Sequence, residues 1–332
     1  MRKIGLILRI VPVVVLVTVG LASCEKTIDV DPPAERELVL NAVPAAGRQA
    51  FVYFGYTRFF LDTDNDQPVG DAEMTFRVNG VARNLDSVRR SKYFFDHVLQ
   101  EDDTLSVDVR VGEKRVHAET YVPKYPAVSN VSNIYMASST FNFVVSSFDL
   151  SDHAGRAEYY NVTVTERDSG ARFNEWTGKI DTVDTVHSAM FLVPLSEEIT
   201  SSEVASYSPM GGRLMFLDRN IEGQTYKVPL WIVYLKDTTE VEPFKHEFKV
   251  EIESVTPARF RYILSASSQG GLTSFFAEQG RVYSNVEGAL GVFAGSAKRE
   301  YSFSLDTILP TPMPSTLPAE VEMMRIGGVK GE

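Results

Sequence analysis

The stretch TLSVDVRV, residues 104–111, alternates polar and apolar side chains without interruption. A period of two places Leu105 and the three valines on one face of an extended strand and the polar residues on the other. The stretch therefore predicts a β-strand with one buried face and one solvated face.

Similar short runs lie on both sides of this strand. They are ELVLNAV (37–43), AFVYFGY (50–56), EMTFRVNG (73–80) and HAETYVP (117–123). Turn residues such as Asn79-Gly80 and Gly112 separate them. Regularly spaced short strands predict an N-terminal Ig-like β-sandwich domain over residues 37–123.

Longer runs of the same kind follow Pro123 and Pro126, which mark a domain border. They are FNFVVSSF (141–148), YYNVTVTER (159–167), TYKVPLWIVYL (225–235) and HEFKVEIESV (246–255). They predict a larger C-terminal β-rich domain over residues 124–309, followed by a flexible tail over 310–332. The predicted class is all-β and mainly antiparallel.

One short helix is expected within this second domain. Thr256 is a suitable N-cap, Pro257 suits the first helical position, and the apolar stripe consists of Phe260, Ile263 and Leu264. The helix is expected to end near Ser268.

The N-terminus has the pattern of an export signal. Arg2 and Lys3 precede an apolar run, and small residues lead to LASC (21–24). This ending resembles the bacterial lipobox, in which the cysteine is acylated and the signal is removed before it. We therefore expect a lipoprotein signal peptide over 1–23, lipidation of Cys24 and a tether over 24–36, where charged residues and prolines predominate.

Composition limits the classes of function. Cys24 is the only cysteine, so the mature chain has no disulfide framework, thiolate metal site or cysteine nucleophile. The formal net charge is −11 and no run rich in lysine or arginine stands out, so nucleic acid is not an expected partner.

The C-terminal block RVYSNVEGALGVFAG (281–295) resembles the ending of the domain of unknown function 4249 family, outer-membrane lipoproteins of Bacteroidetes. Ala289 departs from that pattern, where a second glycine is expected. Other landmarks agree in order: PVGDAEMTFRVNG (68–80), Tyr159-Tyr160, MFLDRNIEGQTYKVPL (215–230) and EIESVTPARFRYI (251–263).

The resemblance implies a lipid-anchored outer-membrane protein that acts as a non-enzymatic binding accessory of a TonB-dependent nutrient transporter. Glu25, Asp29 and Asp31 are similar to surface-export signals of that phylum, so we expect display on the cell surface. The alternative is a fimbrial or adhesive structural lipoprotein, which would require a removable first strand.

No metal site or cofactor is expected. Asp62, Asp64, Asp66 and Glu73 take positions 1, 3, 5 and 12 of a calcium-loop pattern, but Gln67 stands where glycine is needed. We interpret them as an exposed hairpin loop, with opportunistic binding of a calcium ion as the alternative and no EF-hand.

Neither the glycines near the C-terminus nor the histidines form a catalytic motif. Gly288, Gly291 and Gly295 lie among β-forming residues, which indicates bulges or tight β turns and not a dinucleotide fingerprint. The histidines are scattered, and we expect no enzyme, although a pair of carboxylates in a cleft would reopen a hydrolase hypothesis. The five are His97, His117, His153, His187 and His246.

Two further patterns have both structural and functional interpretations. The aromatic residues of 51–60 and Trp176 are expected to be core or edge cover, with stacking on a sugar or a partner protein as the alternative. An Asp-(Ser/Thr) triplet recurs that resembles the O-glycosylation acceptor of exported Bacteroidetes proteins, and turns entering strands produce the same triplet. The acceptors would be Ser87, Thr104, Thr182, Thr185, Thr238 and Thr307.

Overall fold

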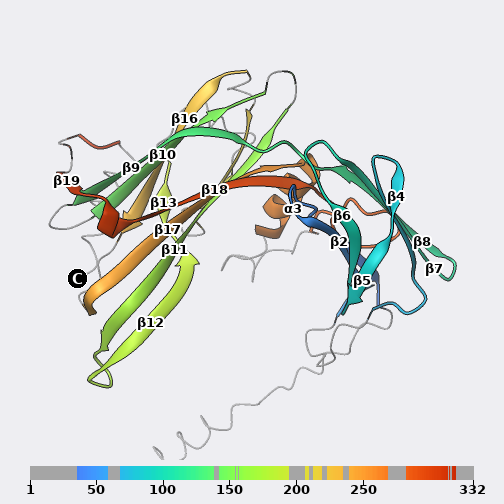
Figure 1. Ribbon diagram of the computed structural model, residues 1–332, viewed down its shortest axis with the longest axis horizontal. Coiled ribbons are helices and arrows are strands. Elements are labelled where there is room, and N and C mark those ends of the chain that lie inside the picture. Colours follow the sequence, from blue (N-terminus) through green and yellow to red (C-terminus); the bar gives the residue numbers. More distant parts are fainter. Residues whose placement is uncertain are drawn as a thin grey trace, which may run out of the picture. The chain divides into compact units, whose positions relative to one another are not determined.

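A computed structural model gives the fold (Figure 1). It describes residues 36–58, 68–137, 142–153, 155, 157–193, 206–208, 212–218, 223–234, 239–267, 282–312, 314 and 316–318. The predicted signal peptide and Cys24 lie outside these residues. Contacts divide the chain into residues 1–36 with 58–62 and residues 37–57 with 63–332, and almost all described residues belong to the second unit. The domain boundaries proposed above stay predictions.

Strands β1 to β8 form a first β-sandwich. They are β1 (Leu38–Asn41), β2 (Gln49–Tyr56), β3 (Glu73–Val78), β4 (Val81–Arg83), β5 (Leu85–Arg89), β6 (Lys92–Val98), β7 (Thr104–Val111) and β8 (Lys114–Tyr121). One sheet has the order β1-β2-β6-β5 and the other β4-β3-β7-β8, with antiparallel pairing throughout.

The first core lies between these two sheets. Leu105, Val107 and Val109 of β7 are buried, as the alternation predicts. Phe76 of β3 stacks on Phe95 of β6 with ring centroids 4.5 Å apart, which joins one sheet to the other. Each such side chain contributes about 1.5–3 kcal/mol through burial, so this alternating pattern is the main source of stability of the sandwich.

A segment from far along the chain completes this first core. Phe293 and Ala297 are fully buried within it. The segment runs parallel to the chain around β1, with bridges that join Val39 to Leu290 and Ala42 to Phe293. The approach is close, because a Cβ at Gly295 would lie 1.8 Å from the carbonyl oxygen of Tyr121. Because Gly295 has no side chain, the two backbones can pack this closely.

Strands β9 to β19 form a second pair of sheets. They are β9 (Ala127–Ala137), β10 (Asn142–Ser151), β11 (Tyr159–Asn174), β12 (Lys179–Ser188), β13 (Phe191–Leu192), β14 (Ser206–Ser208), β15 (Arg213–Leu217), β16 (Thr225–Tyr234), β17 (Glu240–Val255), β18 (Ser296–Ser304) and β19 (Pro310–Pro312). One sheet has the order β13-β16-β10-β9-β19 and the other β14-β15-β11-β17-β18, with β12 also on β11. All pairs are antiparallel except β19 with β9. The predicted all-β, mainly antiparallel class is confirmed.

The core of this second sandwich determines where its candidate site lies. Tyr160, Val162 and Val164 of β11 are fully buried in it, together with Phe248 and Val250 of β17. Because side chains alternate along a strand, residues 166 and 168 of β11 continue the same inward face. The charged residues Glu166 and Asp168 of β11 therefore lie on the inward face, at the end of the sandwich.

Helix α3 (Pro257–Ser267) follows β17 directly, as predicted, and buries Phe260 and Ile263. Thr256 takes the predicted N-cap position, directly before Pro257, but its side chain makes no capping hydrogen bond. The hydroxyl of Thr256 is enclosed in the packed interior and has no hydrogen-bond partner within the described part of the chain. The backbone carbonyl of Thr256 instead accepts from the N–H of Phe260 at 3.0 Å. A short 3-10 helix, η3 (Leu305–Thr307), follows β18.

Among the described residues, no helix has the length and apolar character needed to cross a membrane.

Candidate functional site at the β11–β12 hairpin

Strand β11 is longer than its neighbour β15, and its second half forms a hairpin with β12. Residues 159–163 of β11 pair with β15, and residues 165–174 pair with β12. On its other edge β11 pairs with β17 only as far as Arg172, which lies opposite Glu240. The base of the hairpin therefore lies within the sheet, and the tip extends past its partner strand.

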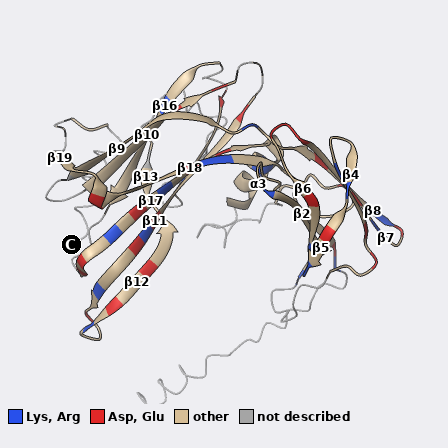
Figure 2. Cartoon of the chain, in the orientation of Figure 1, with Lys and Arg blue, Asp and Glu red and all other residues tan. Residues whose placement is uncertain are grey.

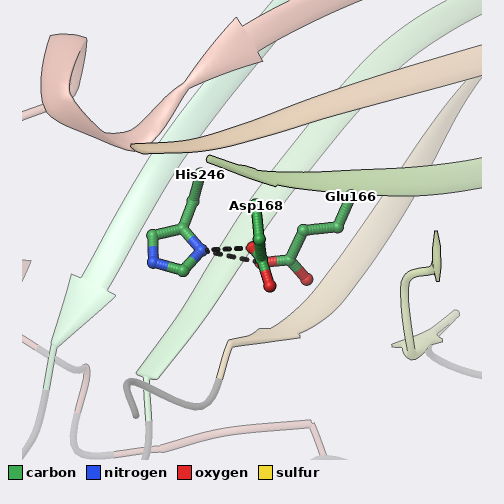
Figure 3. Close-up of side chains that lie close together, drawn as sticks. All are labelled: Glu166, Asp168 and His246. Carbon is green, nitrogen blue, oxygen red and sulfur yellow. Dashed lines mark hydrogen bonds and ion pairs between the residues drawn. The ribbon is translucent and has the colours of Figure 1, made fainter. Parts of the chain in front are cut away.

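A cluster of buried charged side chains lies at this base. Asp168 lies opposite His246 in the register of β11 and β17. Nδ1 of His246 is 2.8 Å from Asp168 Oδ1 and 3.1 Å from Glu166 Oε1 (Figure 3). All three side chains are at most 12% exposed. We call these residues and Glu240, which is 2% exposed, the base cluster.

Further polar groups surround the base cluster. Nε2 of His246 is 3.3 Å from Glu240 Oε2, so both ring nitrogens face carboxylates. The other oxygen of Asp168 is 3.3 Å from Nε2 of His187 and 3.8 Å from a guanidinium nitrogen of Arg172. Asp168 therefore lies between the buried His246 on one side and the partly exposed side chains of Arg172 and His187 on the other.

The cluster perturbs the acid–base properties of its members. Burial alone lowers the pKa of His246, but the hydrogen bond to Glu166 and the charges of Glu240 and Asp168 outweigh it, so this pKa is raised. Burial and the charge of Glu240 likewise raise the pKa of Tyr234, whose ring centroid is 4.7 Å from that of His246.

This arrangement has two chemical capacities. Carboxylates on both sides of an imidazole stabilise its protonated form. The ligand-capable atoms of Glu166, Asp168 and His246 also lie within 4.8 Å of one another, so the same residues could hold a divalent cation.

The tip of the hairpin presents Trp176, which is 98% exposed. Asn174 Oδ1 accepts from the backbone N–H groups of Trp176 at 3.0 Å and Thr177 at 3.1 Å, and its Nδ2 donates to Asp181 at 2.8 Å. The turn is thus ordered by its own hydrogen bonds. The tryptophan borders a shallow pocket of 290 Å³ that Phe173 also lines.

Core or edge cover is therefore the wrong interpretation of Trp176. The pairing of β11 with β17 stops at Arg172, and none of the described strands covers the turn that follows. The aromatic residues of 51–60 divide as expected: Phe54 is fully buried, and Phe51 packs against Phe94 at 5.5 Å. Phe59 and Phe60 lie outside the described residues.

The outer face of the same sheet carries paired charges of both signs. Figure 2 shows acidic and basic residues mixed along β11, β12 and β17. Arg167 contacts Asp184 at 2.8 Å, and Lys249 contacts Glu251 at 2.8 Å. A groove of 580 Å³ on the hairpin side is lined by Arg167 and Lys249 among others. Because the charges are paired, we interpret this face as a solvated surface.

A second acidic group lies where β10 and β15 end and β11 begins. Asp218 is 3% exposed, and its Oδ2 accepts from the backbone N–H of Glu158 at 2.7 Å. The hydroxyl of Tyr160 donates to the Glu158 carboxylate. Burial, together with the neighbouring charges of Asp152 and Glu158, raises the pKa of Asp218 to about 7. Its backbone hydrogen bond only partly opposes that shift.

The structure locates only some of the other predicted site residues. Asp62, Asp64 and Asp66 lie outside the described residues, and Glu73 is the exposed first residue of β3. Of the predicted O-glycosylation acceptors, Thr238 also lies outside. Four are exposed and Ser87 is partly exposed. The four are Thr104, Thr182, Thr185 and Thr307.

The expectation of scattered histidines is wrong for one pair. His187 and His246 both contact Asp168, from β12 and β17 respectively. Sequence reasoning missed this because the pairing of strands, and not sequence spacing, brings the residues together. The one available signal was the period of two along β11, which puts Glu166 and Asp168 on the face of Val162 and Val164.

Comparisons with known proteins give one family and several distant folds. A family model described as "Domain of unknown function (DUF4249)" matches residues 25–302. A search of curated proteins gives no match.

Among solved structures, the collagen adhesin of S. aureus is 8% identical, with a TM-score of 0.21 and coverage of 78% of this chain and 90% of that one. The collagen-binding domain of the Erysipelothrix rhusiopathiae surface protein RspB is 9% identical, with a TM-score of 0.19 and coverage of 80% and 96%.

Proposed function

We propose, from the premise that this chain belongs to the DUF4249 family, that it is a non-enzymatic, lipid-anchored binding protein of the outer membrane that assists a TonB-dependent nutrient transporter. Anchoring through Cys24 and display on the cell surface are parts of this proposal. The β11–β12 hairpin is the proposed recognition element.

The observation that carries the proposal is the exposure of Trp176. A tryptophan that is 98% exposed on an ordered turn contributes almost nothing to the stability of its own chain. Tryptophan is enriched among the residues that dominate binding energy at protein interfaces. Ile180 and Val186 of β12 are also more than 60% exposed, so the β11–β12 hairpin offers several apolar contacts.

The fimbrial alternative needs a first strand that can be removed. Strand β1 is held on both edges. It pairs with β2, and on the other side the N–H of Leu40 donates to the carbonyl of Leu290, whose own N–H donates to the carbonyl of Leu38. Leu38 and Leu40 are also buried in the first core. This arrangement favours a strand that stays in place, and therefore the accessory function.

A pull-down from native outer membrane tests the proposal. The tagged, detergent-solubilised chain is captured, and co-purifying proteins are quantified by mass spectrometry. We expect a TonB-dependent transporter in near-equal amount. Trp176→Ala should reduce its recovery by about 30-fold, which corresponds to roughly 2 kcal/mol. Recovery of the protein alone would contradict the accessory function, and ladders of the chain itself would favour the fimbrial alternative.

Tyr56→Ala is the matched control for that substitution. Tyr56 is an exposed aromatic residue at the end of β2, in the other sandwich. Its removal should leave transporter recovery unchanged. An equal loss with both variants would mean that the hairpin has no specific part in recognition.

A further inference from the structure

We propose that the base cluster binds a divalent transition-metal cation through Glu166, Asp168 and His246. The inference is independent of the proposed accessory function, because it concerns the interior of the second sandwich. It rests on the donor atoms, on the groups that orient them and on their charge.

The donor atoms have the types and separations that such a cation needs. One imidazole nitrogen and two carboxylate oxygens come from adjacent strands, and the nitrogen lies 2.8 Å and 3.1 Å from the oxygens. Around a tetrahedral Zn²⁺ with bonds of about 2.0–2.1 Å, neighbouring donors lie about 3.3–3.4 Å apart. The two nitrogen–oxygen distances therefore need to lengthen by only a few tenths of an ångström, and all three donor atoms already lie within 4.8 Å of one another.

The groups behind the ligands are arranged as at protein metal sites. A metal-bound histidine ordinarily donates its second ring N–H to a carboxylate, which fixes the tautomer. Here Nδ1 faces Glu166 and Asp168, and Nε2 faces Glu240 at 3.3 Å. Asp168 uses Oδ2 for His187 and Arg172, which leaves Oδ1 directed at the proposed cation.

The charges of the cluster also suit a divalent cation. Buried carboxylates are stable only when their charge is compensated. A cation of charge +2 on neutral His246 compensates Glu166 and Asp168. Glu240 lies 3.9 Å from a guanidinium nitrogen of Arg172. A mixed nitrogen and oxygen donor set without thiolate selects Zn²⁺-like ions over soft ions such as Cu⁺.

Aromatic rings enclose the proposed site. The ring of Tyr234 lies edge-on to His246, and the centroid of Phe244 is 5.1 Å from that of His246. Exclusion of water strengthens the attraction between a cation and its carboxylates. A bound ion would join β11 to β17 at the base of the hairpin.

Metal titration of the full chain tests the proposal. The detergent-solubilised protein is stripped with a chelator and titrated with Zn²⁺ by calorimetry and with Co²⁺ by visible absorption. We expect one equivalent of each ion and a tetrahedral Co²⁺ spectrum. Glu166→Gln, Asp168→Asn and His246→Asn should each weaken binding by at least about 10-fold, and Glu240→Gln by about 10- to 100-fold.

His117→Asn is the matched control. His117 Nδ1 also lies 2.8 Å from a carboxylate, that of Asp108, but both side chains are more than a third exposed. This variant should bind Zn²⁺ as the wild type does. The metal site is contradicted if the wild type takes up no equivalent of Zn²⁺ or if the cluster variants bind like the control.

Nitrogen NMR of the wild-type protein decides the matter even if the variants do not fold. With Zn²⁺ present, His246 should show a metal-shifted Nδ1 without a proton and a protonated Nε2. Two protonated ring nitrogens would instead identify an imidazolium held by carboxylates, and the metal proposal would be wrong.

Discussion

The side-chain amide of Asn285 bonds both backbone groups of Phe293: it accepts from the N–H and donates to the carbonyl, each at 2.9 Å. The two bonds close the loop between these residues. The ring of Phe293 is fully buried in the first core, where it lies edge-on to Phe76 with centroids 6.4 Å apart. Asn285 therefore orients the segment that completes the first sandwich.

Replacement of Asn285 by alanine should destabilise the protein by about 2–3 kcal/mol, because two backbone groups of Phe293 lose their partners. Urea unfolding followed by circular dichroism measures the change. Ser284→Ala, at the exposed neighbouring position, should change the free energy of unfolding by less than about 0.5 kcal/mol. Equal effects of the two substitutions would show that the loop does not depend on the amide.

Gly295→Ala should be among the most damaging small substitutions in the chain. The new Cβ would lie 1.8 Å from the carbonyl oxygen of Tyr121, and this neighbour is backbone that cannot rotate away. We expect a loss of at least about 3 kcal/mol, at the upper end of overpacking effects. Gly70→Ala is the control, since nothing lies within 4 Å of its Cβ position. Thermal unfolding of both variants measures the difference, and similar melting temperatures would contradict the close approach.

Trp176→Ala should leave the stability unchanged within about 0.5 kcal/mol, because the indole is almost wholly in water. Phe248→Ala, in the same sheet, should cost about 3–5 kcal/mol, because the ring is fully buried and stacks on Phe303 at 5.3 Å. Differential scanning calorimetry compares the two variants. A large destabilisation by Trp176→Ala would mean that the indole is covered, and the proposed recognition element would lose its basis.

Asp218 should make the protein less stable as the pH rises from about 4 to about 7. Its pKa is raised to about 7 in the folded protein, against an ordinary value of 3.8, so the folded state holds this proton more tightly than the unfolded state. The stabilisation is complete when the pH lies below the pKa that Asp218 has in the unfolded state. It is lost as the pH rises through the pKa that Asp218 has in the folded state. Urea midpoints measured at intervals from pH 4 to pH 8 check this trend.

Asp218→Asn is the matched variant for that titration. Asparagine carries no proton that titrates in this range, so the downward slope of stability against pH should become shallower. An unchanged slope in the variant would assign the pH dependence to other groups.

Sequence patterns predicted the helix and nine of the nineteen strands that the structure describes, because burial of one face produces a period that the sequence displays. The run 104–111 is such a case, and it corresponds to β7 residue for residue. The predicted strand 159–167 stopped at Arg167, within a run of three charged residues, yet β11 continues to Asn174. These charged residues lie within the sheet because β11 pairs with β12 on one edge and with β17 on the other. Local composition does not predict such pairing.

The base cluster could not be predicted for the same reason. His246 lies 80 positions from Glu166 and 78 from Asp168, and only the register of β11 on β17 brings them together. Trp176 was visible in the sequence, but its exposure depends on where the pairing of β17 with β11 ends.

The first sandwich, although it begins near the start of the described chain, cannot finish folding until residues 290–297 have been synthesised. Its strands begin at Leu38, but its core is complete only when Phe293 and Ala297 arrive, after the strands of the second sandwich up to β17 have been synthesised. Contacts of such long sequence separation form slowly because a large loop must close first. A fragment that ends at residue 123 would expose an apolar seam along β1 and β8. The protein is therefore expected to resist dissection into separately produced halves.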